Sequence, residues 1–184
     1  MKKYGVDYKS VNFVNVGSGA DIFKALVGGT IDAGVAPVEF RDTAPAKYKI
    51  FPLVDGEFYK ELPLYVNQAM YASDRAIAEK RHGLIRVMAA FADMFRWMSN
   101  NANKQAFINY YRQAVANASE EEAAFLQDFT AKPGRLATDL VLSEDQLRYI
   151  QDLNVELGSQ KAVLAFSQCA DMTLAQDAVK LIKG

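Results

Sequence analysis

The first third of the chain alternates between two hydrophobic patterns. Apolar and polar residues alternate over residues 11–16, as they do in a strand with one buried face. Residues 20–27 then carry apolar side chains at helical spacing, and the two glycines that follow end this predicted helix. Residues 31–36, 48–54 and 64–71 are predicted to be further short strands. This order predicts βα units.

The pattern changes after Ser73, and the rest of the chain is predicted to be almost wholly helical. A long helix is expected over residues 84–100, with a core-facing stripe formed by Ile85, Met88, Phe91, Phe95 and Met98. Ser119 and Ser143 are each followed three residues later by Glu or Gln, which is the pattern of a capping box at the start of a helix. Gly158 is expected to end the second of these helices.

Together these elements predict an α/β fold. Alternating βα units form a parallel or mixed sheet, and the helices that follow pack onto it. The segment before residue 11 has the character of a helix tail with its C-cap glycine, Gly5. The sequence therefore predicts a partial sheet lobe, which begins inside an α/β unit and is followed by C-terminal helices.

Composition and charge exclude some classes of function. Of the 184 residues, 51% are hydrophobic, which is enough to form a buried core. The formal net charge of −1 argues against a nucleic-acid partner, because such a partner is bound through a basic face. No apolar run approaches the roughly 20 residues that span a bilayer, so no membrane span is expected.

Residues able to ligate a metal or act as nucleophiles are few. The chain has one histidine, His82, and one cysteine, Cys169, so it predicts no metal site and no internal disulfide. Cys169 is interpreted as a buried apolar filler, because no histidine lies near it in the sequence. No spacing supports a catalytic triad or a carboxylate pair. The chain is therefore predicted not to be an enzyme and to bind no cofactor.

The loop Gly17, Ser18 and Gly19 is the first candidate for ligand binding. It follows a predicted strand and opens a predicted helix, where unpaired backbone N–H groups lie at the positive end of the helix dipole. Such a loop can hold a carboxylate, sulfonate or phosphate, with the hydroxyl of Ser18 as an additional contact. Ser18 can equally serve only as the helix cap. Both interpretations remain open at this point.

A second candidate follows the predicted strand 31–36. Ala36, Pro37, Glu39 and Phe40 would lie at the carboxyl edge of the sheet, where ligands bind in open α/β folds. Glu39 could accept hydrogen bonds from an amine or an aminopyrimidine, or could be a solvated carboxylate at a helix start. Phe40 could stack on a flat ligand or pack in the core.

The strand predicted over residues 64–71 supplies the last two candidates. Tyr65 and Asn67 lie two positions apart, so their side chains share one face of this strand. That face can line a ligand cleft, or it can pack against a hinge.

Two of these segments resemble a known family. Residues 14–21 (VNVGSGAD) and 25–33 (ALVGGTIDA) resemble the strand, polar loop and helix signature of type II periplasmic solute-binding proteins. They are most similar to the group that binds sulfonates, nitrate or thiamine precursors.

The resemblance implies two α/β lobes that close on a solute, and a membrane permease of an ABC importer as the partner. In these terms residues 1–63 are most of the second lobe without its first strand and helix. Residues 64–73 are the strand that crosses the hinge, and residues 74–184 are the helices that complete the lobes. An N-terminal lobe is expected to precede this region. The implied ligand is a sulfonate, a nitrate-like anion or a pyrimidine-like molecule.

The resemblance also implies a location. Residues 1–7 contain two lysines but no apolar run, so they are not a secretory signal peptide. A periplasmic protein or a cell-surface lipoprotein is expected, with its signal on sequence outside these 184 residues. Cytoplasmic residence is the alternative.

Two other functions are compatible with the same resemblance. One is an iron-dependent enzyme similar to thiamine-pyrimidine synthase, although such chemistry needs more His and Cys side chains than His82 and Cys169. The other is the ligand-sensing effector domain of a transcription regulator.

Overall fold

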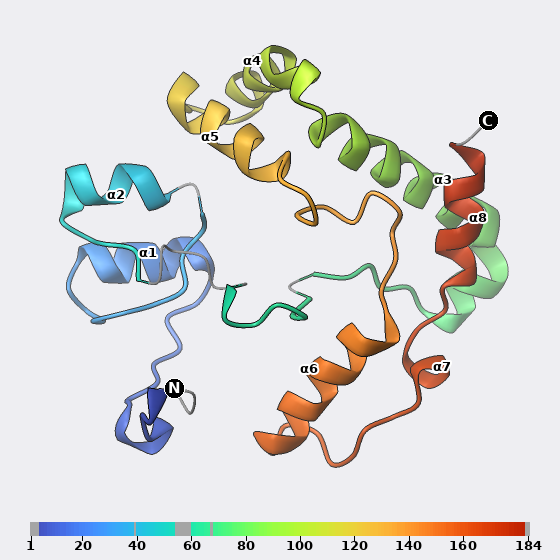
Figure 1. Cartoon of the computed structure of the whole chain (residues 1–184), viewed down its shortest axis with the longest axis horizontal. Coiled ribbons are helices and arrows are strands. Elements are labelled where there is room, and N and C mark those ends of the chain that lie inside the picture. The colour runs from blue at the N-terminus through green and yellow to red at the C-terminus, as the bar shows by residue number, and fades with distance from the viewer. Residues whose placement is uncertain (1–3, 39, 54–59, 67, 183–184) are drawn as a thin grey trace. The chain divides into compact units, whose positions relative to one another are not determined.

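The computed structural model describes residues 4–38, 40–53, 60–66 and 68–182, and these residues form helices joined by irregular segments (Figure 1). Helix accounts for 57% of the structure, and the described residues contain no strand. The predicted α/β fold with a sheet lobe is therefore wrong. The chain divides into two compact units, residues 1–58 and 59–184.

Where the structure describes them, the predicted strands at residues 11–16, 31–36, 48–54 and 64–71 are irregular, except that Tyr48 is the last residue of a helix. Their apolar side chains are largely open: Phe13 is 68% exposed, Val35 65% and Tyr71 92%. A strand needs a neighbour that accepts and donates its backbone hydrogen bonds. Alternating hydrophobicity indicates a surface that could be half-buried, but it does not supply the partner strand.

The first unit contains the short 3-10 helix η2 (Tyr8–Ser10) and the helices α1 (Gly19–Val27) and α2 (Phe40–Tyr48). Helix α1 confirms the helix predicted over residues 20–27, and the chain leaves it through Gly29, whose φ of +68° suits glycine. The two helices meet through aromatic rings, because Phe23 of α1 contacts both Phe40 and Tyr48 of α2.

The second unit is built around α3 (Asp74–Met98) and α8 (Thr173–Leu181), which pack side by side (Figure 1). Lys80 has non-helical angles (φ −126°, ψ 20°), so α3 is kinked there. The sequence predicted a long helix from residue 84, and the structure extends this helix across the kink back to Asp74.

The remaining helices of the second unit form two smaller groups. A turn of 3-10 helix, η5 (Asn101–Asn103), leads into α4 (Lys104–Ala114), which packs against α5 (Glu120–Thr130). Helices α6 (Glu144–Glu156) and α7 (Phe166–Cys169) contact each other.

The predicted helix caps are largely confirmed. Ser143 accepts a hydrogen bond from the backbone N–H of Gln146, whose side chain accepts one in return from the N–H of Ser143. Ser119 accepts from the N–H of Glu122, but the Glu122 carboxylate turns away to accept a hydrogen bond from the hydroxyl of Tyr111. The second box is therefore complete and the first is only half formed.

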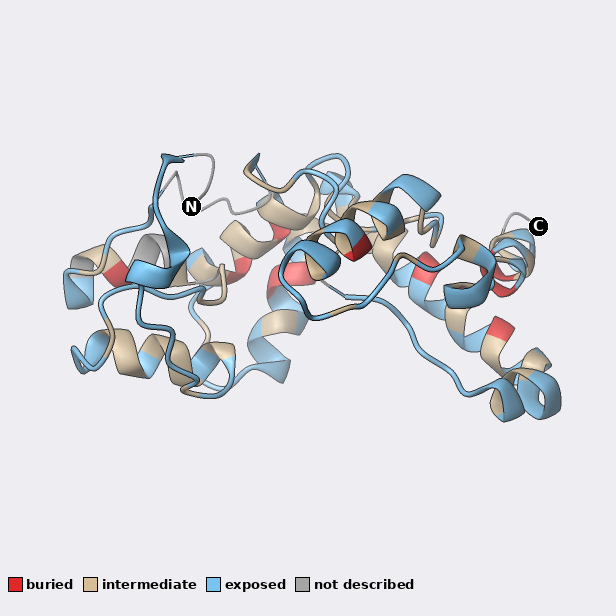
Figure 2. Cartoon of the chain, turned by 90° about the horizontal axis from the view of Figure 1, so that it is seen from below, coloured by how far each residue is buried: buried red, intermediate tan, exposed pale blue. Residues whose placement is uncertain are grey.

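The core of the second unit lies between α3 and α8, where Ile85 and Ala89 meet Leu174 and Ala178. Figure 2 shows that buried positions are few and lie in separate groups along the described helices. The predicted core stripe of α3 is partly wrong, because Phe91 is 40% exposed while Ala89 and Ala92 are buried. The buried face is thus rotated away from Phe91.

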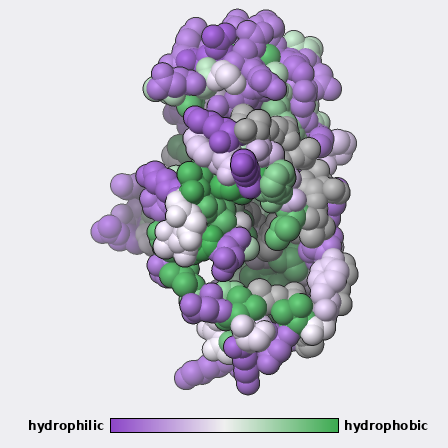
Figure 3. Space-filling model, turned by 90° about the vertical axis from the view of Figure 1, so that its left-hand side faces the viewer, coloured by the Kyte–Doolittle hydropathy of each residue, from purple (hydrophilic) through white to green (hydrophobic). Residues whose placement is uncertain are grey.

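Several other large apolar side chains are also exposed, and Figure 3 shows hydrophobic side chains open on the surface between hydrophilic ones. The prediction that Cys169 is buried is wrong. Cys169 is exposed at the end of α7. None of the described helices combines the length and the apolar character needed to cross a bilayer.

Candidate functional site

The Gly17–Gly19 turn leads directly into α1 and is held by short hydrogen bonds. The Asn15 side chain accepts a hydrogen bond from the backbone N–H of Gly17 at 3.1 Å. Gly17 has a φ of +106°, and a Cβ atom at this position would lie only 2.9 Å from the Asp21 carboxylate. Both observations require glycine here, since other residues rarely adopt this backbone region.

Ser18 is the N-cap of α1, and its polar groups are engaged by Asp21. The Ser18 hydroxyl donates to the Asp21 carboxylate at 2.6 Å, and the Ser18 N–H donates to the same oxygen at 3.0 Å. The Asp21 N–H donates in return to the Ser18 hydroxyl at 3.4 Å. Of the two interpretations of Ser18, the structure contains the capping arrangement.

The Asp21 carboxylate changes the electrostatics of this helix start. Hydrogen bonds from the Ser18 hydroxyl and backbone hold the pKa of Asp21 below its ordinary value of 3.8. Asp21 therefore carries its negative charge at neutral pH, where the helix dipole favours an anion. The Asp21 carboxylate therefore lies where the sequence analysis expected a bound anion.

Two donors of this helix start are open as far as the described residues show. The backbone N–H groups of Gly19 and Ala20 have no hydrogen-bond acceptor among the residues that the structure describes. They belong to the first turn of α1, where such groups lack a partner within the helix. A ligand carbonyl could accept from them beside the Asp21 carboxylate.

The structure brings Pro37 against the same turn. A Cβ atom at Gly19 would lie 3.2 Å from Cδ of Pro37, so the proline ring lies close beside the backbone of Gly19. Ala36 and Pro37 are both half-buried. The predicted site residues on the two sides of residues 20–35 are therefore close in space, without a sheet to align them.

Phe40 follows at the start of α2 and stacks on Phe23. The two ring centroids lie 3.9 Å apart, and the ring planes differ by 6°. Phe40 is half-buried, so part of its surface remains accessible. Sequence reasoning assigned Phe23 only to the apolar face of a helix, and nothing in the local pattern indicated that it supports Phe40.

The structure gives no position relative to this group for the other predicted contacts. Glu39 and Asn67 lie outside the described residues. Tyr65 belongs to the second unit, is 41% exposed, and its backbone N–H donates to the carbonyl of Leu62 at 3.0 Å. The group of predicted site residues gathered by the structure is thus Gly17, Ser18, Gly19, Ala36, Pro37 and Phe40.

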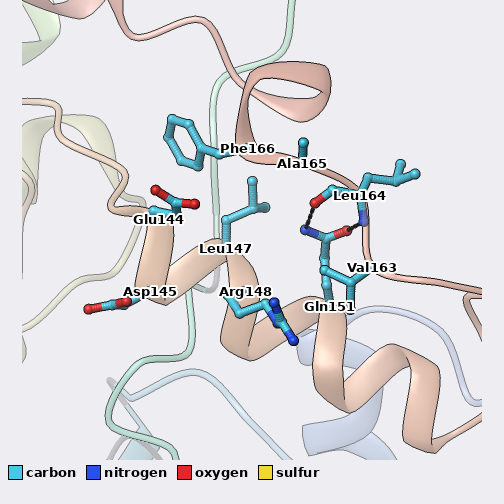
Figure 4. Close-up of a pocket in the computed structure, with 9 residues that line it drawn as sticks. All are labelled: Glu144, Asp145, Leu147, Arg148, Gln151, Val163, Leu164, Ala165 and Phe166. Carbon is cyan, nitrogen blue, oxygen red and sulfur yellow. Dashed lines mark hydrogen bonds between the residues drawn. The ribbon is translucent and has the colours of Figure 1, made fainter.

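A separate hollow lies in the second unit between α6 and the segment that leads into α7 (Figure 4). Its volume is about 410 Å³, and its walls include Leu147, Val163 and Phe166. The Glu144 carboxylate lies on the side of Phe166, whereas the Asp145 carboxylate points away from the hollow (Figure 4). This hollow contains none of the residues that the sequence analysis singled out.

Gln151 forms hydrogen bonds that hold one wall of this hollow in place. Its side-chain oxygen accepts from the backbone N–H of Leu164 at 2.8 Å, and its nitrogen donates to the Leu164 carbonyl at 3.1 Å. The side chain of Gln160 donates to the same oxygen at 2.7 Å. Gln151 is 5% exposed, so its amide pairs with the extended segment as a neighbouring strand would.

One missed residue of the first site had a recognisable signal. Ser18 and Asp21 form the S-x-x-D pattern of a helix start, which by itself indicates that Asp21 can return to the cap. Gln151 had no such signal, because its partners at residues 160–164 are set by tertiary structure.

Within the described residues, no three His, Cys, Asp or Glu side chains gather closely enough to hold a metal ion. No protein-family model matches the chain, and no curated protein or solved structure is significantly similar to it.

Proposed function

We propose that this chain is the solute-binding component of an ABC-type importer, and that its first unit binds a small polar solute. The observation that carries the proposal is the contact between Gly19 and Pro37. This contact joins two segments that the sequence analysis selected as candidates for ligand binding, and Phe40 follows the second of them in the chain.

The resemblance of residues 14–21 and 25–33 to type II solute-binding proteins supports the transport role. This support concerns the class of function and not the fold, which is helical. The proposal keeps the expected mechanism, in which solute binding favours one conformational state that a membrane permease recognises.

The electrostatics of α1 favour one class of solute over the others. A sulfonate or a nitrate-like anion would approach the charged Asp21 carboxylate, which already satisfies the hydroxyl and N–H of Ser18. A neutral heterocycle with an acceptor and a donor, such as an aminopyrimidine, could accept from Gly19 and donate to Asp21. Its flat ring would match the accessible part of Phe40. We therefore propose a pyrimidine-like solute.

A thermal-shift series tests the proposal with cytosine, a small alkyl sulfonate and nitrate as probes. A ligand that binds only the folded state stabilises it by about 2.7 kcal/mol at 100 times its Kd, which raises the midpoint of unfolding. We expect cytosine to raise the midpoint and both anions to leave it nearly unchanged.

Two variants sharpen this test. Gly19→Val fills the space next to Pro37 and should abolish the shift with cytosine, whereas Gly83→Ala has no neighbour within 4 Å and should preserve it. Asp21→Asn removes the negative charge and should improve the response to the sulfonate. A cytosine shift that survives Gly19→Val, or no shift with any probe, would contradict the proposal.

A further inference from the structure

Helix α3 carries two apolar stripes, and within the described part of the second unit only one of them is covered. The first contains Ile85 and Ala89 and packs against α8. The second contains Val87, Phe91 and Met94, which are 53%, 40% and 42% exposed. These three side chains are spaced by four and three residues, so they form one line along the helix.

Two opposite charges lie along one edge of the exposed stripe. Arg86 and Asp93 are both exposed, and neither has a charged partner among the described residues. They are seven residues apart, or two helical turns, so they project from the same side of α3. A rise of about 10.5 Å separates them along the helix axis, which is too far for a direct ion pair.

This arrangement is self-complementary under a two-fold rotation. We propose that the exposed stripe of α3 docks against the same stripe of a second copy of this chain, with the two helices antiparallel and the two-fold axis near Ala90. Arg86 of each copy then faces Asp93 of the other, which forms two equivalent ion pairs, as an isologous interface requires.

The apolar side chains fit the same register. Val87 of one copy lies between Phe91 and Met94 of the other, in the manner of a knob between neighbouring side chains. Ala90 lies at the centre and is exposed, and its small side chain lets the two helices approach closely. A parallel arrangement would instead place Arg86 beside Arg86 and Asp93 beside Asp93, which is unfavourable.

The charges beside the stripe also favour a second copy of the chain as its partner, and not a membrane surface. The charges at the edge of the stripe cancel, so an anionic lipid surface would attract Arg86 and repel Asp93 equally. The stripe alone is smaller than the roughly 800 Å² per partner of a standard interface, so a weak dimer is expected. This inference goes beyond the proposed function and does not depend on it.

Sedimentation velocity of the full chain over a range of micromolar concentrations measures the association directly. We expect a reversible monomer–dimer equilibrium. Phe91→Ser should weaken the dimer by at least about tenfold, because truncating a central aromatic residue removes much of the binding energy. Leu157→Ser is the matched control: Leu157 is 68% exposed outside the stripe, and this change should leave the association unaltered.

A charge exchange tests the register. Arg86→Asp and Asp93→Arg should each fail to self-associate, because each places like charges opposite one another. An equal mixture of the two variants should form a heterodimer with two ion pairs, one with reversed polarity between the substituted positions and one between the unchanged Arg86 and Asp93. Circular dichroism of each variant checks that it has the helical content of the parent chain. A chain that stays monomeric at all concentrations would overturn the proposal, as would mixed variants that do not associate.

Discussion

The rings of Phe23 and Phe40 lie face to face, with their centroids 3.9 Å apart and their planes 6° from parallel. Phe23 also makes an edge-to-face contact with Tyr48, so two ring contacts join α1 to α2. The first unit therefore depends on aromatic packing to hold Phe40 in position.

A double-mutant cycle measures the strength of this ring pair. Phe23→Leu and Phe40→Leu should each lower the free energy of unfolding, and the double variant should lose less than the sum. We expect a coupling energy of about 0.5–1.5 kcal/mol, which is typical of aromatic pairs. Additive losses in chemical denaturation would show that the rings do not interact.

Two glycines should respond in opposite ways to alanine. A Cβ atom at Gly34 would lie 2.5 Å from Cγ2 of Ile22, so Gly34→Ala should destabilise the first unit by about 1–3 kcal/mol through overpacking. Gly83 lies within α3 with nothing within 4 Å of such an atom, and Gly83→Ala should stabilise the protein by about 0.5–1 kcal/mol. Urea denaturation of both variants provides the comparison, and equal effects would refute this explanation.

Asp177 should make stability depend on pH. Hydrogen bonds from Lys180 and Arg81 hold the pKa of this carboxyl below its ordinary value of 3.8, and Arg81 thereby ties α3 to α8. Because the unfolded state binds the proton more readily, this contribution is present above pH 3.8 and is lost as pH falls through the lower pKa of the folded state.

Asp177→Asn should therefore lower the free energy of unfolding at pH 7, and the difference from the parent should shrink as the solution is acidified. Denaturation curves at several pH values measure this trend. Glu79→Gln is the control, since Glu79 is exposed on α3 and has no charged partner among the described residues. A difference that stays constant with pH would count against the assigned role of Asp177.

Gln127 is fully buried in α5, and its side-chain oxygen has no hydrogen-bond partner among the described residues. Its nitrogen donates to the Met98 carbonyl at 3.5 Å, which is a long bond. Gln127→Met should raise the free energy of unfolding by about 1 kcal/mol, because it removes an unsatisfied polar atom at similar volume.

Gln127→Glu should have the opposite effect, with a loss of at least about 2 kcal/mol from burying a charge. Gln176→Met on the exposed surface of α8 should change little. The denaturation midpoints of these three variants distinguish the explanations, and a stable Gln127→Glu would show that the site is open to solvent.

Local sequence patterns predicted the helices well. The predictions of strands, which depend on pairing with distant residues, were wrong. Ser143 with Gln146, and the glycine after α6, are determined by residues a few positions apart, so their pattern was sufficient. The strand at residues 11–16 was predicted from alternation alone. Whether such a segment joins a sheet depends on distant residues, and no local pattern contains that information.

In the candidate site, too, some features could be predicted from the sequence and others could not. The glycine turn and Pro37 were both candidates from the sequence, and the structure brings Pro37 close to Gly19. The sequence analysis considered only the hydroxyl of Ser18 and did not predict the role of Asp21. The Asp21 carboxylate, three residues later, belongs to the same capping pattern. The stacking of Phe23 on Phe40 depends on how α1 meets α2, which the sequence did not reveal.

Among the described residues, six of the ten buried apolar side chains are alanines, and Ala92, Ala123 and Ala178 are wholly inaccessible. Helices that meet through methyl groups leave no room for a larger atom, so substitutions there push whole backbones apart. In a saturation mutagenesis experiment, the smallest side chains of this protein should therefore be the least replaceable. Many of its phenylalanines and leucines, which face solvent, should accept polar replacements. Evolution of this chain would then be constrained most tightly at its buried alanines, which have the smallest side chains.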